Sequence, residues 1–176
     1  MDRVGRRAAV WVFGTASVVY LLDRATKLWA EHALPGHPID VIPGALTLRF
    51  TTNSGGAFSV GEGSPWLFVG ASIAVIVALL FMGFRRRDRL YRVAVGLVLA
   101  GALGNLTDRA LRGPGFRGRV IDFVDLHVWP VFNLADSAIV VGALLIAWDS
   151  LRSRDRAAPA AAATGSSAEG GRADDA

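Results

Sequence analysis

Long apolar runs dominate the pattern of this chain, and charged residues border each of them. A helix rises about 1.5 Å per residue, so about 20 apolar residues can cross a hydrocarbon core of roughly 30 Å. Apolar stretches cover residues 8–22, 65–84, 93–106 and 131–148, and only the last contains a charged residue, Asp136. With their polar extensions these runs predict four transmembrane helices, near residues 8–24, 65–84, 93–111 and 131–149.

The composition agrees with a membrane protein. Hydrophobic residues make up 52% of the 176 positions and charged residues only 19%, and the mean hydropathy is +0.40. Such a chain is too apolar for an ordinary soluble domain of this length. We therefore expect an α-helical membrane protein with one folded domain at residues 1–156.

The net charge is +4, and three clusters of basic residues lie at helix ends, while Arg109, Arg112, Arg117 and Arg119 lie between the third and fourth runs and fit the pattern less well. One cluster precedes the first apolar run, one lies between the second and third, and one follows the fourth. With four crossings all three fall on one side of the membrane, and the positive-inside rule places that side and both termini in the cytoplasm. No basic stripe is interleaved with aromatic residues outside the membrane, so we expect no nucleic-acid partner.

The segment between the first two helices carries a strand pattern. Residues 46–51 alternate apolar and polar side chains, and Pro43-Gly44 predicts a turn before them. We expect a small extracytoplasmic β-sheet near residues 39–60. At its end, Asn53 and Gly55 are candidates for holding an extended peptide by its backbone. The alternative is a hairpin turn that positions nothing.

The C-terminal residues 157–176 contain alanine, glycine, serine and charged residues but no large apolar side chain. Such a segment has nothing to bury that would offset the entropy of ordering it. It is expected to be a disordered cytoplasmic tail.

Carboxylates are the acid–base groups that remain after other chemistry is considered. The chain has no cysteine, and its three histidines show no metal-binding spacing, so we expect neither a metal site nor a cofactor. No histidine or lysine lies inside an apolar run to activate a serine. Asp122 and Asp136, fourteen positions apart, lie at the edge of the fourth run. An acid at a bilayer edge is costly and indicates a functional site.

Two such acids in close contact cannot both ionise, so one keeps a proton and the other serves as a base. This arrangement predicts a membrane-embedded aspartic protease. The competing interpretation is a small proton-coupled carrier subunit, in which the acids relay protons. The outer β-segment has no obvious use in a proton relay and favours the protease.

Four sequence blocks resemble the bacterial lipoprotein signal peptidase family, also called signal peptidase II, over residues 8–150. In order they are Asp23-Arg-Ala-Thr-Lys27, Asn53-Ser-Gly-Gly-Ala-Phe58, Gly101-Ala-Leu-Gly-Asn-Leu-Thr-Asp-Arg109, and Val120-Ile-Asp-Phe123 with Phe132-Asn-Leu-Ala-Asp136. Two positions depart from the usual family pattern: Ala100 precedes Gly101 where a glycine is usual, and Gly56 stands in the second block where alanine or serine is commoner. Both residues are still small.

The resemblance implies a metal-free catalytic pair of Asp122 and Asp136. The substrate would be a diacylglyceryl-modified prolipoprotein, cut on the amino side of its lipidated cysteine. It also implies a multi-pass protein of the bacterial cytoplasmic membrane, in contact with lipid, with its active site near the extracytoplasmic face. We expect a monomer.

Further residues of the four blocks receive supporting roles from the same resemblance. Asn105 and Asn133 would orient the two carboxyl groups, although they could instead form interhelical hydrogen bonds. Asp108 and Arg109 match an acid–arginine pair, in which Arg109 either binds substrate carbonyls or only satisfies Asp108.

Two further acids near these blocks are expected to lie outside the catalytic pair. Asp23 and Lys27 are spaced for a structural i,i+4 ion pair. Asp125, the nearest competitor of Asp122, is expected to face water in irregular chain.

Overall fold

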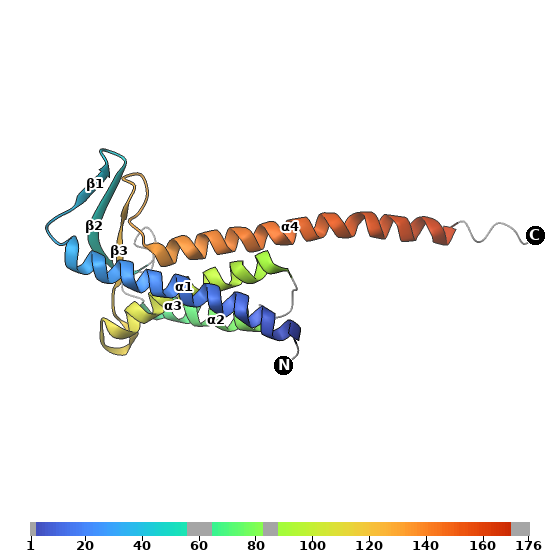
Figure 1. The fold of residues 1–176 in the computed structure, drawn as a ribbon, viewed down its shortest axis with the longest axis horizontal. Coiled ribbons are helices and arrows are strands. Elements are labelled where there is room, and N and C mark those ends of the chain that lie inside the picture. The colour runs from blue at the N-terminus through green and yellow to red at the C-terminus, as the bar shows by residue number, and fades with distance from the viewer. Residues whose placement is uncertain (1–2, 56–64, 83–87, 170–176) are drawn as a thin grey trace, which may run out of the picture.

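A computed structural model describes residues 3–55, 65–82 and 88–169, and the side chains of residues 6–55, 66–81 and 88–152. The chain is mostly helical, with a small sheet at one end of the helices (Figure 1). Its elements are α1 (Arg3–Ala33), β1 (Ile39–Ile42), β2 (Leu46–Asn53), α2 (Pro65–Met82), α3 (Arg89–Leu111), the short 3-10 helix η2 (Pro114–Phe116), β3 (Val120–Asp125) and α4 (Leu134–Glu169).

Three helical stretches in the described part of the chain are long and apolar enough to cross a membrane: Arg6–Ala33, Arg89–Leu111 and Leu134–Arg152. A shorter apolar helix covers Trp66–Phe81, within the second predicted helix. The chain is therefore a multi-pass membrane protein. Its helices run alternately toward and away from the sheet, with the N-terminus at the far end from the sheet (Figure 1).

The helices extend beyond the predicted bounds where polar side chains find partners. α1 continues to Ala33 instead of ending near residue 24, because Asp23 and Lys27 form a buried ion pair that lets the helix continue. α3 begins at Arg89 instead of residue 93, because the carboxylate of Asp88 accepts a hydrogen bond from the backbone N–H of Leu90 and caps the helix.

The last helix differs from its prediction at both ends. α4 begins at Leu134 and not near residue 131, because Phe132 pairs with Val124 of β3 through backbone hydrogen bonds. It continues to Glu169, so residues 157–169 are helical where the sequence predicted a disordered tail. Alanine has the highest helix propensity, and alanine-rich chain following an established helix tends to prolong it.

The sheet is antiparallel with the strand order β1-β2-β3. β1 and β2 confirm the predicted strands, and Gly44 lies in the turn between them with a positive φ of 74°. β3 was not predicted, because its side chains are covered on both faces and show no alternation of apolar and polar positions. In the pairing of β2 with β3, Thr51 lies opposite Asp122 and Asn53 opposite Val120, so the Asn53 and Asp122 side chains share one face of the sheet.

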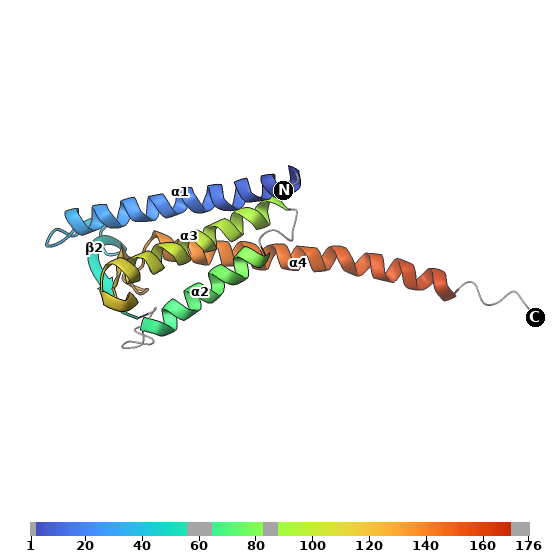
Figure 2. The ribbon, with the colours of Figure 1, turned by 90° about the horizontal axis from the view of Figure 1, so that it is seen from below.

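Helix α3 packs against both α1 and α4, and glycines allow the close approach (Figure 2). A Cβ atom at Gly101 would lie 2.3 Å from the carbonyl oxygen of Ala135 in α4. One at Gly104 would lie 2.5 Å from Oδ2 of Asp23 in α1. These contacts bring the polar residues of three helices together next to the sheet.

Candidate active site

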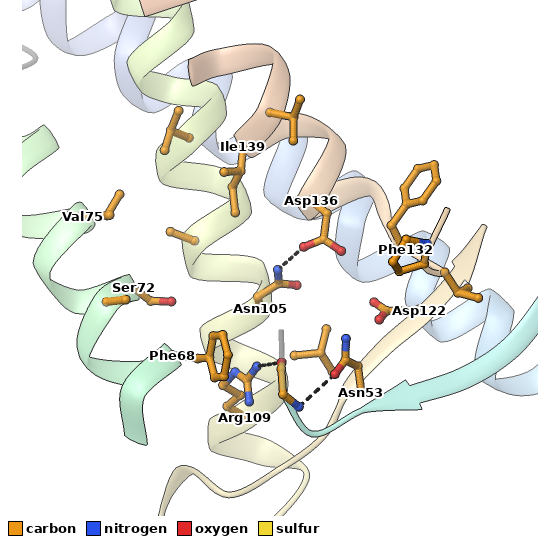
Figure 3. Close-up of a pocket in the computed structure, with 18 of the residues that line it drawn as sticks. Asn53, Phe68, Ser72, Val75, Asn105, Arg109, Asp122, Phe132, Asp136 and Ile139 are labelled. Carbon is orange, nitrogen blue, oxygen red and sulfur yellow. Dashed lines mark hydrogen bonds between the residues drawn. The ribbon is translucent and has the colours of Figure 1, made fainter. Parts of the chain in front are cut away.

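Asp122 and Asp136 face the same cavity, although they come from different kinds of element. Asp122 lies in the middle of β3, and Asp136 lies in the first turn of α4. Both carboxyl groups line a cavity of about 400 Å³ bounded by α2, α3, α4 and the ends of β2 and β3 (Figure 3). Asp122 is almost fully buried, with 2% of its surface exposed.

Three acceptors satisfy the N-terminal amides of α4. The backbone N–H of Asp136 donates to Oδ1 of Asn133 at 3.0 Å, and the N–H of Asn133 donates back to Oδ2 of Asp136 at 3.2 Å. This reciprocal arrangement is a capping box. The N–H of Ala135 donates to Oδ1 of Asp23 in α1 at 3.0 Å. The helix start that carries Asp136 is thus held by its own side chains and by α1.

The two asparagines each direct an amide group at a carboxyl group. Nδ2 of Asn133 donates to Oδ1 of Asp122 at 2.7 Å and to the carbonyl oxygen of Ile121 at 3.1 Å. Nδ2 of Asn105 donates to Oδ1 of Asp136 at 2.8 Å (Figure 3). Asn133 therefore contacts both acids and sets their relative position. The two asparagines also contact each other, with Nδ2 of Asn133, which precedes α4, donating to Oδ1 of Asn105 in α3 at 3.3 Å.

Burial makes Asp122 hard to ionise. Desolvation, followed by the nearby charge of Asp136, raises the pKa of Asp122 from its ordinary 3.8 to about 7. Hydrogen bonds from Asn133 and Asn53 and the charge of Lys27 oppose this pKa shift but do not cancel it. An acid with such a pKa holds its proton in neutral solution for a large fraction of the time.

A buried charge cluster of α1 and α3 lies next to this pair. The ammonium of Lys27 lies 3.0 Å from carboxylate oxygens of both Asp23 and Asp108, which confirms the predicted i,i+4 pair. Asp108 also accepts hydrogen bonds from Arg24 and Arg112. The acid therefore pairs with three cations, Lys27, Arg24 and Arg112.

Arg109 instead binds backbone carbonyls of its own chain. Its guanidinium donates to the carbonyl oxygens of Ser54 at 3.4 Å and Gly55 at 2.8 Å, and it lies 5.1 Å from the ring centre of Phe68 in α2. The N–H of Gly55 donates to Oδ1 of Asn53 at 2.9 Å. These contacts fold the end of β2 against the cavity, where Asn53, Gly55 and Arg109 all form part of the lining (Figure 3).

Asp125 lies outside the cavity lining, but the sequence was wrong about its surroundings. It ends a regular strand, only 8% of its surface is exposed, and its carboxylate accepts a hydrogen bond from Arg49. This contact lowers the pKa of Asp125 below its ordinary value. An odd spacing of three along a strand turns its side chain away from that of Asp122.

The remaining wall of the cavity is largely apolar and was not predicted. It is formed by Phe68, Ala71 and Val75 of α2 and by Ile139 of α4 (Figure 3). Helix α2 is apolar on every side, so its sequence carries no period to show which face borders the site. Arg24 and Arg112 were also missed, although their positions next to Asp23 and one turn after Asp108 were signals for an ion-pair network.

Comparisons with known proteins agree with this site. A family model described as signal peptidase (SPase) II matches residues 15–152. The chain is 40% identical over 147 residues to the lipoprotein signal peptidase of Mycobacterium avium (strain 104), covering 82% of this chain and 80% of that relative. It is 42% identical over 137 residues to the lipoprotein signal peptidase of Rhodococcus jostii (strain RHA1), covering 77% of this chain and 69% of that relative.

The fold is similar to that of solved bacterial membrane enzymes. One, determined by the in meso method at 2.3 Å resolution, matches with a TM-score of 0.73 and 30% identity over 81% of this chain and 88% of its own. Another, at 1.9 Å resolution, matches with a TM-score of 0.68 and 31% identity over 78% and 90% of the two chains. The sequence relatives, the matching folds and the two carboxyl groups on one cavity lead to the same conclusion: the chain belongs to the signal peptidase (SPase) II family, whose members remove signal peptides from prolipoproteins.

Proposed function

We propose that this chain cleaves diacylglyceryl-modified prolipoproteins on the amino side of the lipidated cysteine, with Asp122 and Asp136 as its catalytic pair. The observation that carries the proposal is that both acids face one cavity and are bridged by Asn133. The apolar wall beside them suits the lipid and the apolar signal segment of such a substrate. The proton-carrier interpretation gains no support from the relatives.

The surroundings of the two acids favour different protonation states. Asp136 accepts a hydrogen bond at each carboxylate oxygen, from Asn105 and from the backbone of Asn133, and it lies at a helix N-terminus, where negative charge is favoured. Asp122 lies in a buried strand, and its raised pKa favours the protonated form. We assign Asp136 as the base and Asp122 as the acid of the resting enzyme.

The reaction then proceeds through a tetrahedral intermediate. Asp136 takes a proton from water as the water oxygen bonds to the scissile carbonyl carbon, and Asp122 gives its proton to the carbonyl oxygen. The resulting gem-diol collapses as the carbon–nitrogen bond breaks. Asp136 passes its proton to the leaving amine, and Asp122 takes one from a gem-diol hydroxyl as the carbonyl reforms. Both acids return to their starting states, and no metal or cofactor takes part.

The sequence and the helix directions support one placement in the cytoplasmic membrane. The described basic residues of the three clusters lie away from the sheet: Arg6 and Arg7 near the start of α1, Arg89 and Arg92 in the first turn of α3, and Arg152 at the end of the candidate span of α4. By the positive-inside rule these ends are cytoplasmic, so α2 would be a fourth crossing and the catalytic pair would lie near the extracytoplasmic face. We propose a monomer that contacts lipid and binds no nucleic acid.

The test of the catalytic pair uses purified variants and a diacylglyceryl-modified prolipoprotein. Asp122→Asn and Asp136→Asn are nearly isosteric, but an amide can neither accept the water proton nor hold the shared one, so uncut substrate should accumulate with each. The double variant should be little worse than either single one, since the two acids act as a unit.

Asp125→Asn is the matched control, because it neutralises a carboxylate of the same strand outside the cavity lining. It should retain most of its activity. Substantial cleavage by folded Asp122→Asn or Asp136→Asn protein would refute the aspartyl mechanism.

A further inference from the structure

Lys27 is fully buried and makes one contact that its ion pairs do not explain. Its ammonium has three hydrogen atoms to donate. Two are directed at the carboxylates of Asp23 and Asp108, each at 3.0 Å. The third is donated to Oδ1 of Asn105 at 2.9 Å. Lys27 thus lies one side chain away from Asp136.

This contact determines which way the Asn105 amide faces. An ammonium group only donates, so the amide group of Asn105 must present its oxygen to Lys27. The NH₂ end of the same amide then faces Asp136, to which it donates at 2.8 Å. A turn of the amide by 180° would place NH₂ against the ammonium and an oxygen against the carboxylate, and both contacts would become repulsive. Lys27, whose 2.9 Å contact is shorter than the 3.3 Å contact from Nδ2 of Asn133 to the same oxygen, therefore holds a donor at Asp136.

The charged groups around Asp136 are few. Asp122 faces it from β3, Arg109 lies on α3 within electrostatic reach of both acids, and Asp23 and Lys27 come from α1. The described part of α2 has no ionisable side chain. The positive charge of Lys27 polarises the Asn105 amide, and this amide in turn donates a stronger hydrogen bond to Asp136.

We propose that Lys27 is a positioning residue of the reaction: by holding the Asn105 amide with its NH₂ group toward Asp136, it keeps Asp136 the proton acceptor of the catalytic pair. This inference rests on the proposed aspartyl reaction. A purely structural cation would need only two of its three donors, to pair with Asp23 and Asp108. The third contact, to Asn105, is what links Lys27 to the catalytic pair.

The test compares pH profiles of kcat/KM, whose acidic limb reports protonation of the catalytic base in the free enzyme. Lys27→Met alone would leave Asp23 buried without its cation, so the test variant is Asp23→Asn with Lys27→Met. This pair of substitutions removes one charge of each sign and leaves the net charge unchanged. Without Lys27, nothing charged holds the NH₂ group of Asn105 toward Asp136. A carboxylate that loses a charge-assisted hydrogen bond protonates more readily, so the acidic limb should move to higher pH by about one unit.

Two controls separate this effect from the loss of charge in the cluster. Asp23→Asn alone keeps Lys27 in place and retains an oxygen for the N–H of Ala135. Because it removes a negative charge near Asp136, its limb should stay at the wild-type pH or move to lower pH, opposite to the shift expected of the test variant. Arg24→Met removes another cation that pairs with Asp108, and it leaves the amides of Asn105 and Asn133 untouched. Its limb should also stay in place, whatever its effect on thermal stability.

Asn105→Ala keeps the ion pairs of Lys27 and provides a second measurement if the paired variant does not fold. Its acidic limb should rise by a similar amount, and adding Asp23→Asn with Lys27→Met should move it no further. An unmoved limb in Asn105→Ala, or in the folded paired variant, overturns the inference. If Asp136→Asn still cleaves substrate, the proposed function itself fails; if it is inactive while the limb stays unmoved, only the role of Lys27 fails.

Discussion

At the scale of single residues, the burial of Asp122 couples folding to pH. Because its pKa in the folded chain is about 7, against an ordinary value of 3.8, the folded state keeps a proton that the unfolded state releases between these pH values. The stability that this proton contributes is present below about pH 4 and is lost as pH rises to about 7. The difference between these two pKa values corresponds to a contribution to the free energy of unfolding on the order of 4 kcal/mol at most.

Asp122→Asn removes this group, so the variant should gain thermal stability relative to the wild type as pH rises from 4 to 8. Melting temperatures in detergent across this range measure the effect. Asp125→Asn should instead melt lower than the wild type by a similar margin throughout this range, because the Arg49 contact lowers the pKa of Asp125 and its stabilising effect is complete above the ordinary value of 3.8. Parallel melting curves for Asp122→Asn and the wild type would contradict the assigned burial of Asp122.

The residues of the candidate site were largely predictable, but their contacts were not. Asp122 and Asp136 were identified because acids at a membrane edge are costly and because the four blocks carry a family pattern. The link from Lys27 through Asn105 to Asp136 depends on the distance between α1, α3 and α4. Sequence spacing fixes neighbours within one helix and leaves the partners across helices open, which is why the sequence could not decide whether Arg109 binds carbonyls or only satisfies Asp108.

At the scale of elements, α3 holds the site together through its glycines. Gly101→Ala would place a Cβ 2.3 Å from the carbonyl oxygen of Ala135 and 2.6 Å from Cγ1 of Ile139. Because the nearer atom belongs to the backbone of α4, the helices must separate, at a cost of about 1–3 kcal/mol. Asp136 follows Ala135 directly, so cleavage should fall together with the melting temperature.

Gly14→Ala in α1 is the matched control, since within the described chain no atom beyond the neighbouring helix backbone lies within 4 Å of the added Cβ. Alanine is also the better helix former, so this variant should melt no lower than the wild type. Wild-type stability and activity in Gly101→Ala would show that α3 and α4 pack less closely than the structure has them.

The errors at this scale have a common cause in tertiary pairing. β3 shows no alternation because both of its faces are covered, and α4 starts late because Phe132 pairs with a strand. α1 runs past its first charged residues because Asp23 and Lys27 pair with each other and Lys27 also pairs with Asp108 of α3. Local patterns located the helices and the first two strands, and the pairing of distant segments decided their ends.

At the scale of the whole molecule, β3 and the start of α4, which carry Asp122 and Asp136, lie at the opposite end of the helices from the N-terminus (Figure 1). Hydropathy predicted the helical class and the number of apolar runs, but the orientation in the membrane rests on charge alone. The chain has no cysteine, so single cysteines can test that orientation. Ala45→Cys lies in the exposed turn before β2, and Arg152→Cys lies exposed at the end of the last candidate span.

A membrane-impermeant maleimide should label Ala45→Cys in intact cells and Arg152→Cys only after the membrane is opened. The physical reason is the positive-inside rule acting on the three arginine clusters. Cleavage activity of both variants confirms that each is folded. Labelling of Arg152→Cys in intact cells, with Ala45→Cys protected, would reverse the orientation and put the catalytic pair on the cytoplasmic side, where a translocated lipoprotein precursor could not reach it.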